Sequence, residues 1–265
     1  MAAGIAYILA GSDLKGIGDR IDNAFHARID AGQKHYPGLD DVRIPDSIPS
    51  EIVRYTGFQL SFNKDNHTPY WVAWELLQDE TDGSASRNNK FWHDNSVEGC
   101  SWTEDYRSSG YDRGHMCPAA DQKWSGQAMT DCFSMANMAP QSRKLNSGAW
   151  NNLEKRCRMY ARRDSAIIIV CGPVYEPSDN ERIGNTGVRV PGAFFKVMIA
   201  PYLKEPRGIG FVYPNTGAYG NMNNYAMSID EVEELTGFDF FHNLPDEIET
   251  KIESDYSFHL WESQQ

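Results

Sequence analysis

The sequence predicts an α+β fold in which helices pack against a largely antiparallel central sheet. Apolar runs of strand length recur between turns that are rich in Gly, Pro and polar residues. Two other stretches, residues 145–162 and the one that follows Ser228, have the features of helices. A content of 40% hydrophobic and 12% aromatic residues over 265 residues is typical of a packed globular protein.

The first 45 residues are expected to form an N-terminal extension that packs on a main domain of residues 46–265. This extension contains a candidate amphipathic helix, Leu14–Ile29, and ends in turn-rich sequence with two prolines. The apolar run Gly4–Ala10 is short and has no cationic region before it, so it does not match a signal peptide. No run approaches the roughly 20 apolar residues of a membrane-spanning helix, and we expect no membrane partner.

Two β-rich runs follow the extension. Residues 52–63 (IVRYTGFQLSFN) and 68–77 (TPYWVAWELL) are separated by polar residues, and we expect them to form an antiparallel hairpin. The mixed apolar character of the second run predicts a strand that is covered on both faces. A long polar stretch, residues 79–109, comes next and shows no clear period. Loops of this length in compact domains are often functional.

Helices and strands are also expected in the second half of the chain. A short helix is predicted near residues 127–129. A longer one is predicted over residues 145–162, where apolar residues recur at four-residue steps and basic residues stand at the end. Ser228, with Glu231 three residues later, forms a capping-box pattern that begins a further helix. Three strands are expected between these helices, at residues 165–170, within 190–201 and within 207–215.

The charge distribution does not by itself indicate a nucleic-acid partner, because the formal net charge is −12. However, residues 143–163 contain seven basic residues and one acid, which gives this segment +6 and the rest of the chain −18. Residues 228–255 contain ten acids and one lysine. A basic strip within an acidic protein can hold a phosphate backbone locally while long-range attraction stays weak.

The five cysteines show no CxxC spacing, which argues against both a zinc site and a thiol-based redox protein. The odd number leaves at least one thiol free or intermolecular. Two alternatives stay open, ordinary buried cysteines and one disulfide, so the cysteines do not fix the cellular compartment.

The residues between Tyr111 and Arg158 have the chemistry that phosphodiester hydrolysis needs. This reaction requires an activated water, neutralisation of the phosphoryl oxygens and help for the leaving oxygen. His115 could accept a proton near neutral pH because the ordinary pKa of histidine is about 6.5. Arg113 stands two residues earlier, on the same side of an expected strand.

The predicted helix over residues 145–162 brings further polar groups together. Asn146, Glu154 and Arg158 fall within about 120° of one another on an ideal helix. An asparagine oxygen suits Mg²⁺, and Glu154 could then hold the water around the ion. An ordinary surface pair between Glu154 and Arg158 is the competing interpretation.

Ordered motifs extend this interpretation. The sequence DRGH stands at residues 112–115, PAAD at 118–121, NMAPQ at 137–141 and LNSGAWNNLE at 145–154. Together with DYRSSG upstream and CGPVYEP and VPGAFFKV downstream, they resemble the DNA/RNA non-specific endonuclease family of ββα-metal nucleases. The similarity is greatest to the endonuclease G branch and covers about Phe58 to Phe241. It implies that a ββα-metal finger carries the active site.

The resemblance also implies a role for each site residue. His115 would be the general base, and Asn146 the single direct protein ligand of Mg²⁺, or of Mn²⁺ as a substitute. Glu154 would orient the hydrated ion, and Asn137 would support the histidine and the metal region. Among the arginines, Arg113 and Arg158 would bind and neutralise phosphate, while Arg87 and Arg107 compete as the arginine that the preceding loop supplies.

The implied activity is Mg²⁺-dependent hydrolysis of DNA and RNA without sequence preference, leaving 5′-phosphate and 3′-hydroxyl ends. Contacts to phosphate carry no base identity, which agrees with sequence-tolerant cutting. The alternative is a non-catalytic module on the same fold that binds nucleic acid or protein. A homodimer and an unknown protein inhibitor are left open. We expect a secreted or periplasmic protein whose leader is absent from this sequence, with a mitochondrial location second.

Overall fold

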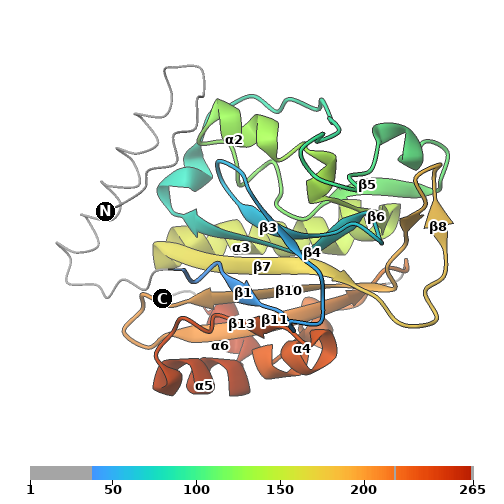
Figure 1. The fold of residues 1–265 in the computed structure, drawn as a ribbon. Helices are drawn as coiled ribbons and strands as arrows, with labels where there is room; N and C mark the ends of the chain where they lie inside the picture. Colours follow the sequence, from blue (N-terminus) through green and yellow to red (C-terminus); the bar gives the residue numbers. More distant parts are fainter. Residues whose placement is uncertain (1–37, 218, 264–265) are drawn as a thin grey trace, which may run out of the picture. The chain divides into compact units, whose positions relative to one another are not determined.

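A seven-stranded antiparallel sheet forms the centre of the protein (Figure 1). The computed structural model describes residues 38–217 and 219–263, which belong to one compact unit. The predicted helix Leu14–Ile29 and most of the predicted extension lie outside these residues. The strands in sheet order are β12 (Ala226–Met227), β11 (Arg207–Pro214), β10 (Ala193–Ala200), β7 (Ala166–Val174), β4 (Thr68–Leu77), β3 (Gln59–Asn63) and β2 (Glu51–Arg54).

The predicted hairpin is confirmed, but its first run forms two strands rather than one. β3 and β4 pair antiparallel, with Gln59 opposite Ala73. Within the first run, the backbone N–H of Tyr55 donates to the carbonyl of Phe58 at 2.9 Å and closes a turn between β2 and β3. β4 and β7 are central strands, and every residue of β7 is buried, as its apolar sequence predicts.

The two faces of the sheet are covered by different helices. On β10, Lys196 and Met198 point toward α3 (Asn151–Asp164) and the residues before it, whereas Phe195 packs against Phe238 and Phe240 on the other face. Helices α4 (Ile229–Thr236) and α5 (Asp246–Ser254) lie on this second face, against β11. A Cβ at Gly208 of β11 would stand 2.6 Å from an Ile229 side-chain carbon, so glycine permits this close packing.

The predicted helices are present. The first six residues of the long one, Leu145–Trp150, form a π-helix (η4), and α3 continues from it. α4 begins with the predicted capping box, because Ser228 and Glu231 exchange side-chain to backbone hydrogen bonds of 3.1 and 2.8 Å. It ends at Gly237, whose φ of 72° is left-handed. The shorter helices are α2 (Gly126–Asp131), α6 (Phe258–Glu262), η1 (Asp79–Asp82), η2 (Thr103–Tyr106), η3 (Met135–Asn137) and η5 (Met222–Tyr225).

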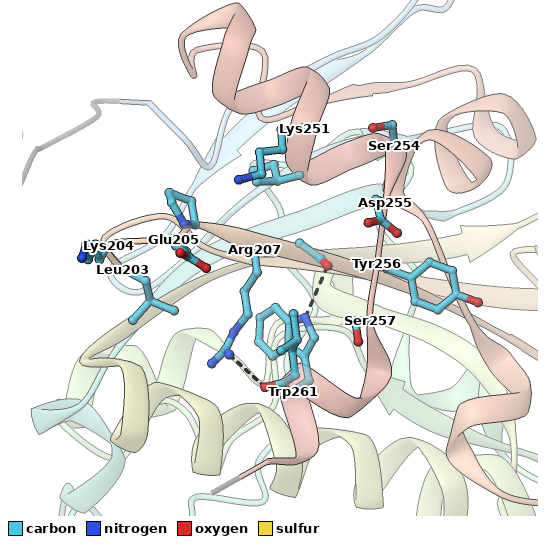
Figure 2. Close-up of a pocket in the computed structure, with 14 residues that line it drawn as sticks. Leu203, Lys204, Glu205, Arg207, Lys251, Ser254, Asp255, Tyr256, Ser257 and Trp261 are labelled. Atoms are coloured by element: carbon cyan, nitrogen blue, oxygen red, sulfur yellow. Dashed lines mark hydrogen bonds between the residues drawn. The ribbon is translucent and has the colours of Figure 1, made fainter. Parts of the chain in front are cut away.

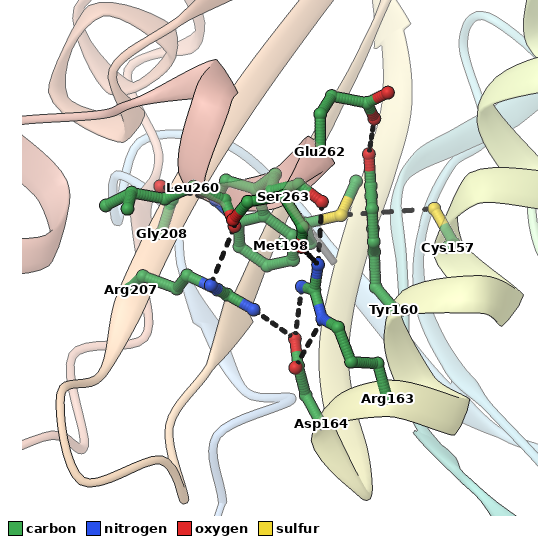
Figure 3. A network of polar contacts seen from close by, with 11 residues as sticks. Cys157, Tyr160, Arg163, Asp164, Met198, Arg207, Gly208, Leu260, Glu262 and Ser263 are labelled. Atoms are coloured by element: carbon green, nitrogen blue, oxygen red, sulfur yellow. Dashed lines mark hydrogen bonds and ion pairs between the residues drawn. The ribbon is translucent and has the colours of Figure 1, made fainter. Parts of the chain in front are cut away.

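Ion pairs and hydrogen bonds attach the C-terminal segment to α3 (Figure 3). Asp164 accepts from Arg163 at 2.7 Å and from Arg207 at 2.6 Å. Both arginines also donate to backbone carbonyls of the C-terminal residues, including that of Trp261.

A cavity of ≈ 540 Å³ lies between this segment, α5 and the β10–β11 loop, with Lys251, Arg207 and Trp261 in its wall (Figure 2).

Three two-stranded sheets complete the fold. The one that matters for the site is the hairpin of β5 (Tyr111–His115) and β6 (Met138–Ser142), and α2 lies in the connection between them. The others pair β1 (Val42–Arg43) with β13 (Asp239–Phe240), and β8 (Arg182–Ile183) with β9 (Val188–Arg189). Within the described residues, no helix has both the length and the apolar character needed to cross a bilayer.

All five cysteines are free and buried, which decides between the two alternatives that the sequence left open. Burial raises the pKa of Cys132 and of Cys157 to about 12, and that of Cys117 well above its ordinary value. The thiols are therefore protonated at neutral pH and unreactive. Cys117, two residues after His115, has a packing role, and its sulfur accepts from Gln122 Nε2 at 3.1 Å.

Candidate active site

The β5–β6 hairpin holds His115 at its end, opposite Met138. The preceding Gly114 is needed for steric reasons, because a Cβ there would lie 2.3 Å from the Gln141 side-chain oxygen. The imidazole packs against two rings, with centroid distances of 5.5 Å to Phe91 and 4.9 Å to Phe133. Sequence and local packing thus fix both the position and the orientation of this histidine.

Two arginines cover the aromatic rings that surround the imidazole. The guanidinium of Arg113 lies 4.2 Å from the centroid of Phe91, and that of Arg87 lies 5.2 Å from the centroid of Phe133. Arg113 comes from β5 itself, whereas Arg87 comes from the long polar loop. The structure therefore brings Arg87, Arg113 and His115 together, and their role in binding phosphate stays a prediction.

The pKa of His115 differs from that of an ordinary imidazole. Burial lowers its pKa, and with the smaller effect of the Arg87 and Arg113 charges the pKa falls to about 3. The side chain is 9% exposed, and its Nε2 atom is buried without a hydrogen-bond partner among the described residues. The ring is consequently neutral at physiological pH, with a nitrogen that can accept a proton.

Asn137 is fully buried and fixes the backbone that follows His115. Its Oδ1 accepts from the N–H of Cys117 at 2.9 Å, and its Nδ2 donates to the carbonyls of Cys117 and Cys132, both at 2.9 Å. These three bonds tie β5 to the loop before β6. This arrangement agrees with the predicted supporting role of Asn137.

Asn146 lies in η4 and is held by the first residue of the DRGH motif. Its Nδ2 donates to Oδ2 of Asp112 at 3.0 Å, across 34 residues of sequence. The amide oxygen is consequently directed away from Asp112 and accepts no hydrogen bond from the described residues. A free carboxamide oxygen beside a carboxylate suits a hard divalent cation, so the residues present fit Mg²⁺.

Glu154 and Arg158 lie on α3, but they do not form the surface pair that was the competing interpretation. Arg158 Nη1 instead donates to Oδ1 of Asp121 at 2.7 Å, with only 12% and 1% of the two side chains exposed. Burial raises the pKa of Glu154 to about 7, with Lys196 and Arg158 opposing the shift. Since η4 is a π-helix, the ideal 100° spacing does not extend from Asn146 to these residues.

Lys196 lies under this part of the site, and its ammonium is buried without a hydrogen-bond acceptor among the described residues. The Nζ atom stands 4.4 Å from the ring centroid of Trp150 and 5.2 Å from that of Trp74. These contacts place a cation in the core beneath Glu154 and Asp121, where it compensates their negative charge.

Arg107 and Arg113 line one pocket of ≈ 260 Å³ together with Asp112. Among residues 38–217 and 219–263, no carboxylate forms an ion pair with Arg87, Arg107 or Arg113. Their charges are therefore available to a ligand. Both loop arginines border the site, so the geometry does not choose between Arg87 and Arg107.

The basic strip at residues 143–163 is largely neutralised. Four of its seven basic side chains pair with acids, which are Glu262, Asp121, Asp82 and Asp164 for Arg156, Arg158, Arg162 and Arg163 respectively. Most of these side chains thus attach α3 to its neighbours. The cations that remain free for phosphate come chiefly from β5 and the long loop.

The residues that surround the predicted ones could not be recognised from the motifs. Asp112 and Asp121 were visible as the acids of the DRGH and PAAD motifs, but they received no role. Phe91 and Phe133, which bury His115, had no signal in sequence because they lie in irregular segments. Lys196 is the single charged residue of the apolar strand β10, and the sequence does not show that its ammonium is buried beneath the site.

Comparisons with known proteins identify the family of the chain. The sequence model of the DNA/RNA non-specific endonuclease family matches residues 39–247. The chain belongs to this family. A crystal structure titled as the EndoG/EndoGI complex and the mechanism of EndoG inhibition matches with a TM-score of 0.69 and 28% identity, covering 73% of this chain and 86% of that one. The fold prediction, an α+β protein of the ββα-metal nuclease type, is confirmed.

Curated relatives support the same membership. Mouse "Nuclease EXOG, mitochondrial" is 35% identical over 213 residues, which cover 74% of this chain and 58% of the relative. Bovine "Endonuclease G, mitochondrial" is 30% identical over 222 residues, which cover 74% of each chain. The chain thus spans less than two thirds of the length of the EXOG relatives it matches.

The expectation of a secreted or periplasmic protein is wrong. Relatives from mouse, human, fission yeast, budding yeast and cow are all named as mitochondrial nucleases. The error arose because the residues of a nuclease site are the same in either compartment, so the motifs carried no information about location.

Proposed function

We propose that this chain is a metal-dependent endonuclease that hydrolyses phosphodiester bonds of both DNA and RNA, leaving 5′-phosphate and 3′-hydroxyl ends. One observation carries the proposal. A neutral His115 with a free ring nitrogen lies at the end of the β5–β6 hairpin, near two arginines that have no carboxylate partner. Asp112 of the same hairpin orients Asn146. This combination serves proton transfer beside a phosphate, and membership of the nuclease family supports it.

In this proposal the arginines bind substrate by leaving the aromatic rings. A cation–π contact at a partly exposed site stabilises by only about 0.5–1 kcal/mol, less than a charge-assisted bond to phosphate. Arg87 and Arg113 would therefore turn from Phe133 and Phe91 onto the phosphate oxygens. Their movement would also uncover the two rings that pack against the imidazole and so give water a path to His115.

Substrate binding would at the same time make His115 a stronger base. The pKa of His115 is lowered by burial and then by the two arginine charges. A bound phosphate neutralises those charges and adds a negative one, so the pKa rises toward the neutral range when substrate is present. Nε2 of His115 would then take the proton of the attacking water.

Asn146 and Glu154 are assigned to the metal ion, and Arg158 to the position of α3. Asn146 would bind Mg²⁺, or Mn²⁺ in its place, through the amide oxygen that Asp112 leaves free. When bound, this ion supplies Lewis-acid stabilisation of the charge that develops on the phosphate. Glu154 would orient its water shell. Arg158 is paired with Asp121 and mostly buried, so only the small exposed part of its guanidinium could contact phosphate. We therefore assign Arg158 chiefly to positioning α3.

Nucleic acid is thus the proposed partner, and we propose mitochondria as the compartment, as the names of the relatives indicate. A protein inhibitor is a second proposed partner, because the similar crystal structure is titled as a complex with an inhibitor. A homodimer remains an untested expectation.

A cleavage assay tests the proposed activity. The purified chain should degrade plasmid DNA and an RNA transcript, chelator should stop it, and Mg²⁺ or Mn²⁺ should restore it. His115→Ala should lose nearly all cleavage while keeping the wild-type circular dichroism spectrum, and His259→Ala, at an exposed histidine of α6, should be unaffected. Binding without cleavage by the wild-type protein would instead identify a non-catalytic module.

A further inference from the structure

Three carboxylates meet between α4 and α5, on the sheet face opposite His115 and Asn146. Asp230 and Glu233 come from α4, and Glu253 comes from α5. One oxygen from each residue lies within 4.8 Å of the others. Oxygens that bind one Ca²⁺ at 2.3–2.6 Å can be at most about 5 Å apart, so these three are close enough to share an ion.

Glu253 provides an independent sign that a ligand is needed. The residue is only 6% exposed, and its Oε1 atom is buried without a hydrogen-bond partner among the described residues. Burying a carboxylate without a partner is costly, and native structures normally supply a cation or donors. Among the described residues, no Lys or Arg forms an ion pair with any of the three acids.

The position of Glu253 on its helix also disfavours a negative charge that has no cation beside it. It is the penultimate residue of α5, where the free carbonyl groups of the helix end disfavour an acid and favour a cation. When ionised, the three carboxylates also repel one another, because their oxygens lie within 4.8 Å. A bound divalent cation would remove this repulsion.

We propose that Asp230, Glu233 and Glu253 form a second metal site, which takes a hard divalent cation of the calcium type and joins α4 to α5. Carboxylate oxygens are the ligands that Ca²⁺ prefers, and its flexible shell of six to eight oxygens can be completed by water at exposed Asp230. The site is structural. It stabilises the helices that cover the second face of the sheet and has no part in phosphodiester cleavage.

The position of the site separates it from the nuclease chemistry. Val232 of α4 and Ile252 of α5 pack against glycines of β11, whereas α3 and the β5–β6 hairpin lie on the other side of the sheet (Figure 1). The two ions can therefore be studied independently. Failure of the cleavage assay would leave this proposal standing, and the reverse also holds.

Calorimetric titration of Ca²⁺ into the full chain tests the proposal. The protein is first stripped with chelator and carries Asn146→Ala, which removes the proposed ligand of the catalytic ion. We expect one Ca²⁺ per chain and a rise in the thermal unfolding midpoint on adding Ca²⁺. Mg²⁺ should bind more weakly, because it demands a smaller octahedral shell. Equal or tighter binding of Mg²⁺ would overturn the assignment to a calcium-type ion.

Variants then locate the ion. In the same background, Glu253→Gln should weaken Ca²⁺ binding at least tenfold and abolish the thermal shift. Asp230→Asn, at an exposed position that does not endanger folding, should weaken binding as well. Glu234→Gln, at an exposed acid of α4 outside the cluster, is the matched control and should bind normally. Absence of Ca²⁺ binding, or binding that survives both Glu253→Gln and Asp230→Asn, would overturn the proposal.

Discussion

Replacing Asp112 should weaken the use of Mg²⁺ without destroying the catalytic apparatus. The Asp112 carboxylate accepts one hydrogen bond of 3.0 Å from Asn146 Nδ2 and thereby sets the direction of the amide oxygen. A hydrogen bond to a charged group contributes about 1.5–3 kcal/mol, which corresponds to roughly a tenfold to hundredfold change in an equilibrium constant. Residues that orient a metal ligand typically alter metal affinity by the same range.

The assay is a titration of Mg²⁺ against the initial rate of plasmid cleavage. For Asp112→Ala, the Mg²⁺ concentration that gives half-maximal rate should rise about tenfold to hundredfold, and much of the rate should return at saturating Mg²⁺. Asp112→Asn keeps an acceptor but loses the charge, so it should fall between Asp112→Ala and wild type. Glu104→Gln, at an exposed acid of η2, serves as the control. An unchanged Mg²⁺ requirement in Asp112→Ala would refute this reasoning.

Three further predictions follow from the described contacts. The pKa of His115 is about 3 in the folded protein and about 6.5 when unfolded, so the unfolded chain binds more protons between these values and acid destabilises the fold. Between pH 6.5 and pH 4, thermal unfolding should show wild type losing more stability than His115→Asn, by up to about 3 kcal/mol; equal losses would contradict the low pKa. Arg87→Ala should raise KM for DNA and reduce the slope of log affinity against log salt by about 1, whereas Lys204→Ala, in the β10–β11 loop, should leave both unchanged. Asp121→Asn leaves Arg158 buried without its charged partner and should cost about 3 kcal/mol in urea unfolding; a loss below 1 kcal/mol would show that the pair is not structural.

The fold could be predicted where sequence patterns are local. β7 reads as a buried strand because all its residues are apolar or small, and the α4 capping box is contained within four residues. The turn between β2 and β3 was missed because Tyr55 and Phe58 have strand-like side chains, although they stack on each other at 4.7 Å across the turn. The π-helix before α3 could not be predicted either, because no sequence pattern distinguishes it from the ordinary α-helical spacing of apolar residues.

The residues of the active site could be predicted from the sequence, but their hydrogen bonds, burial and pKa values could not. His115 and Asn146 stand in recognisable motifs, whereas the 3.0 Å bond that joins Asn146 to Asp112 spans 34 residues of chain. The low pKa of His115 depends mainly on burial by rings from two irregular segments. The ordinary pKa of histidine, about 6.5, therefore does not describe His115 in the free protein.

An anomalous difference map of crystals grown with Mn²⁺ would test the central claim most directly. If Asn146 holds the catalytic ion, a peak should lie at its Oδ1 atom, which the hydrogen bond to Asp112 leaves free. Loss of that peak in Asn146→Ala, together with loss of cleavage, would agree with the assignment. A crystal of active protein whose Mn²⁺ peaks all lie elsewhere, with none beside Asn146, would contradict it.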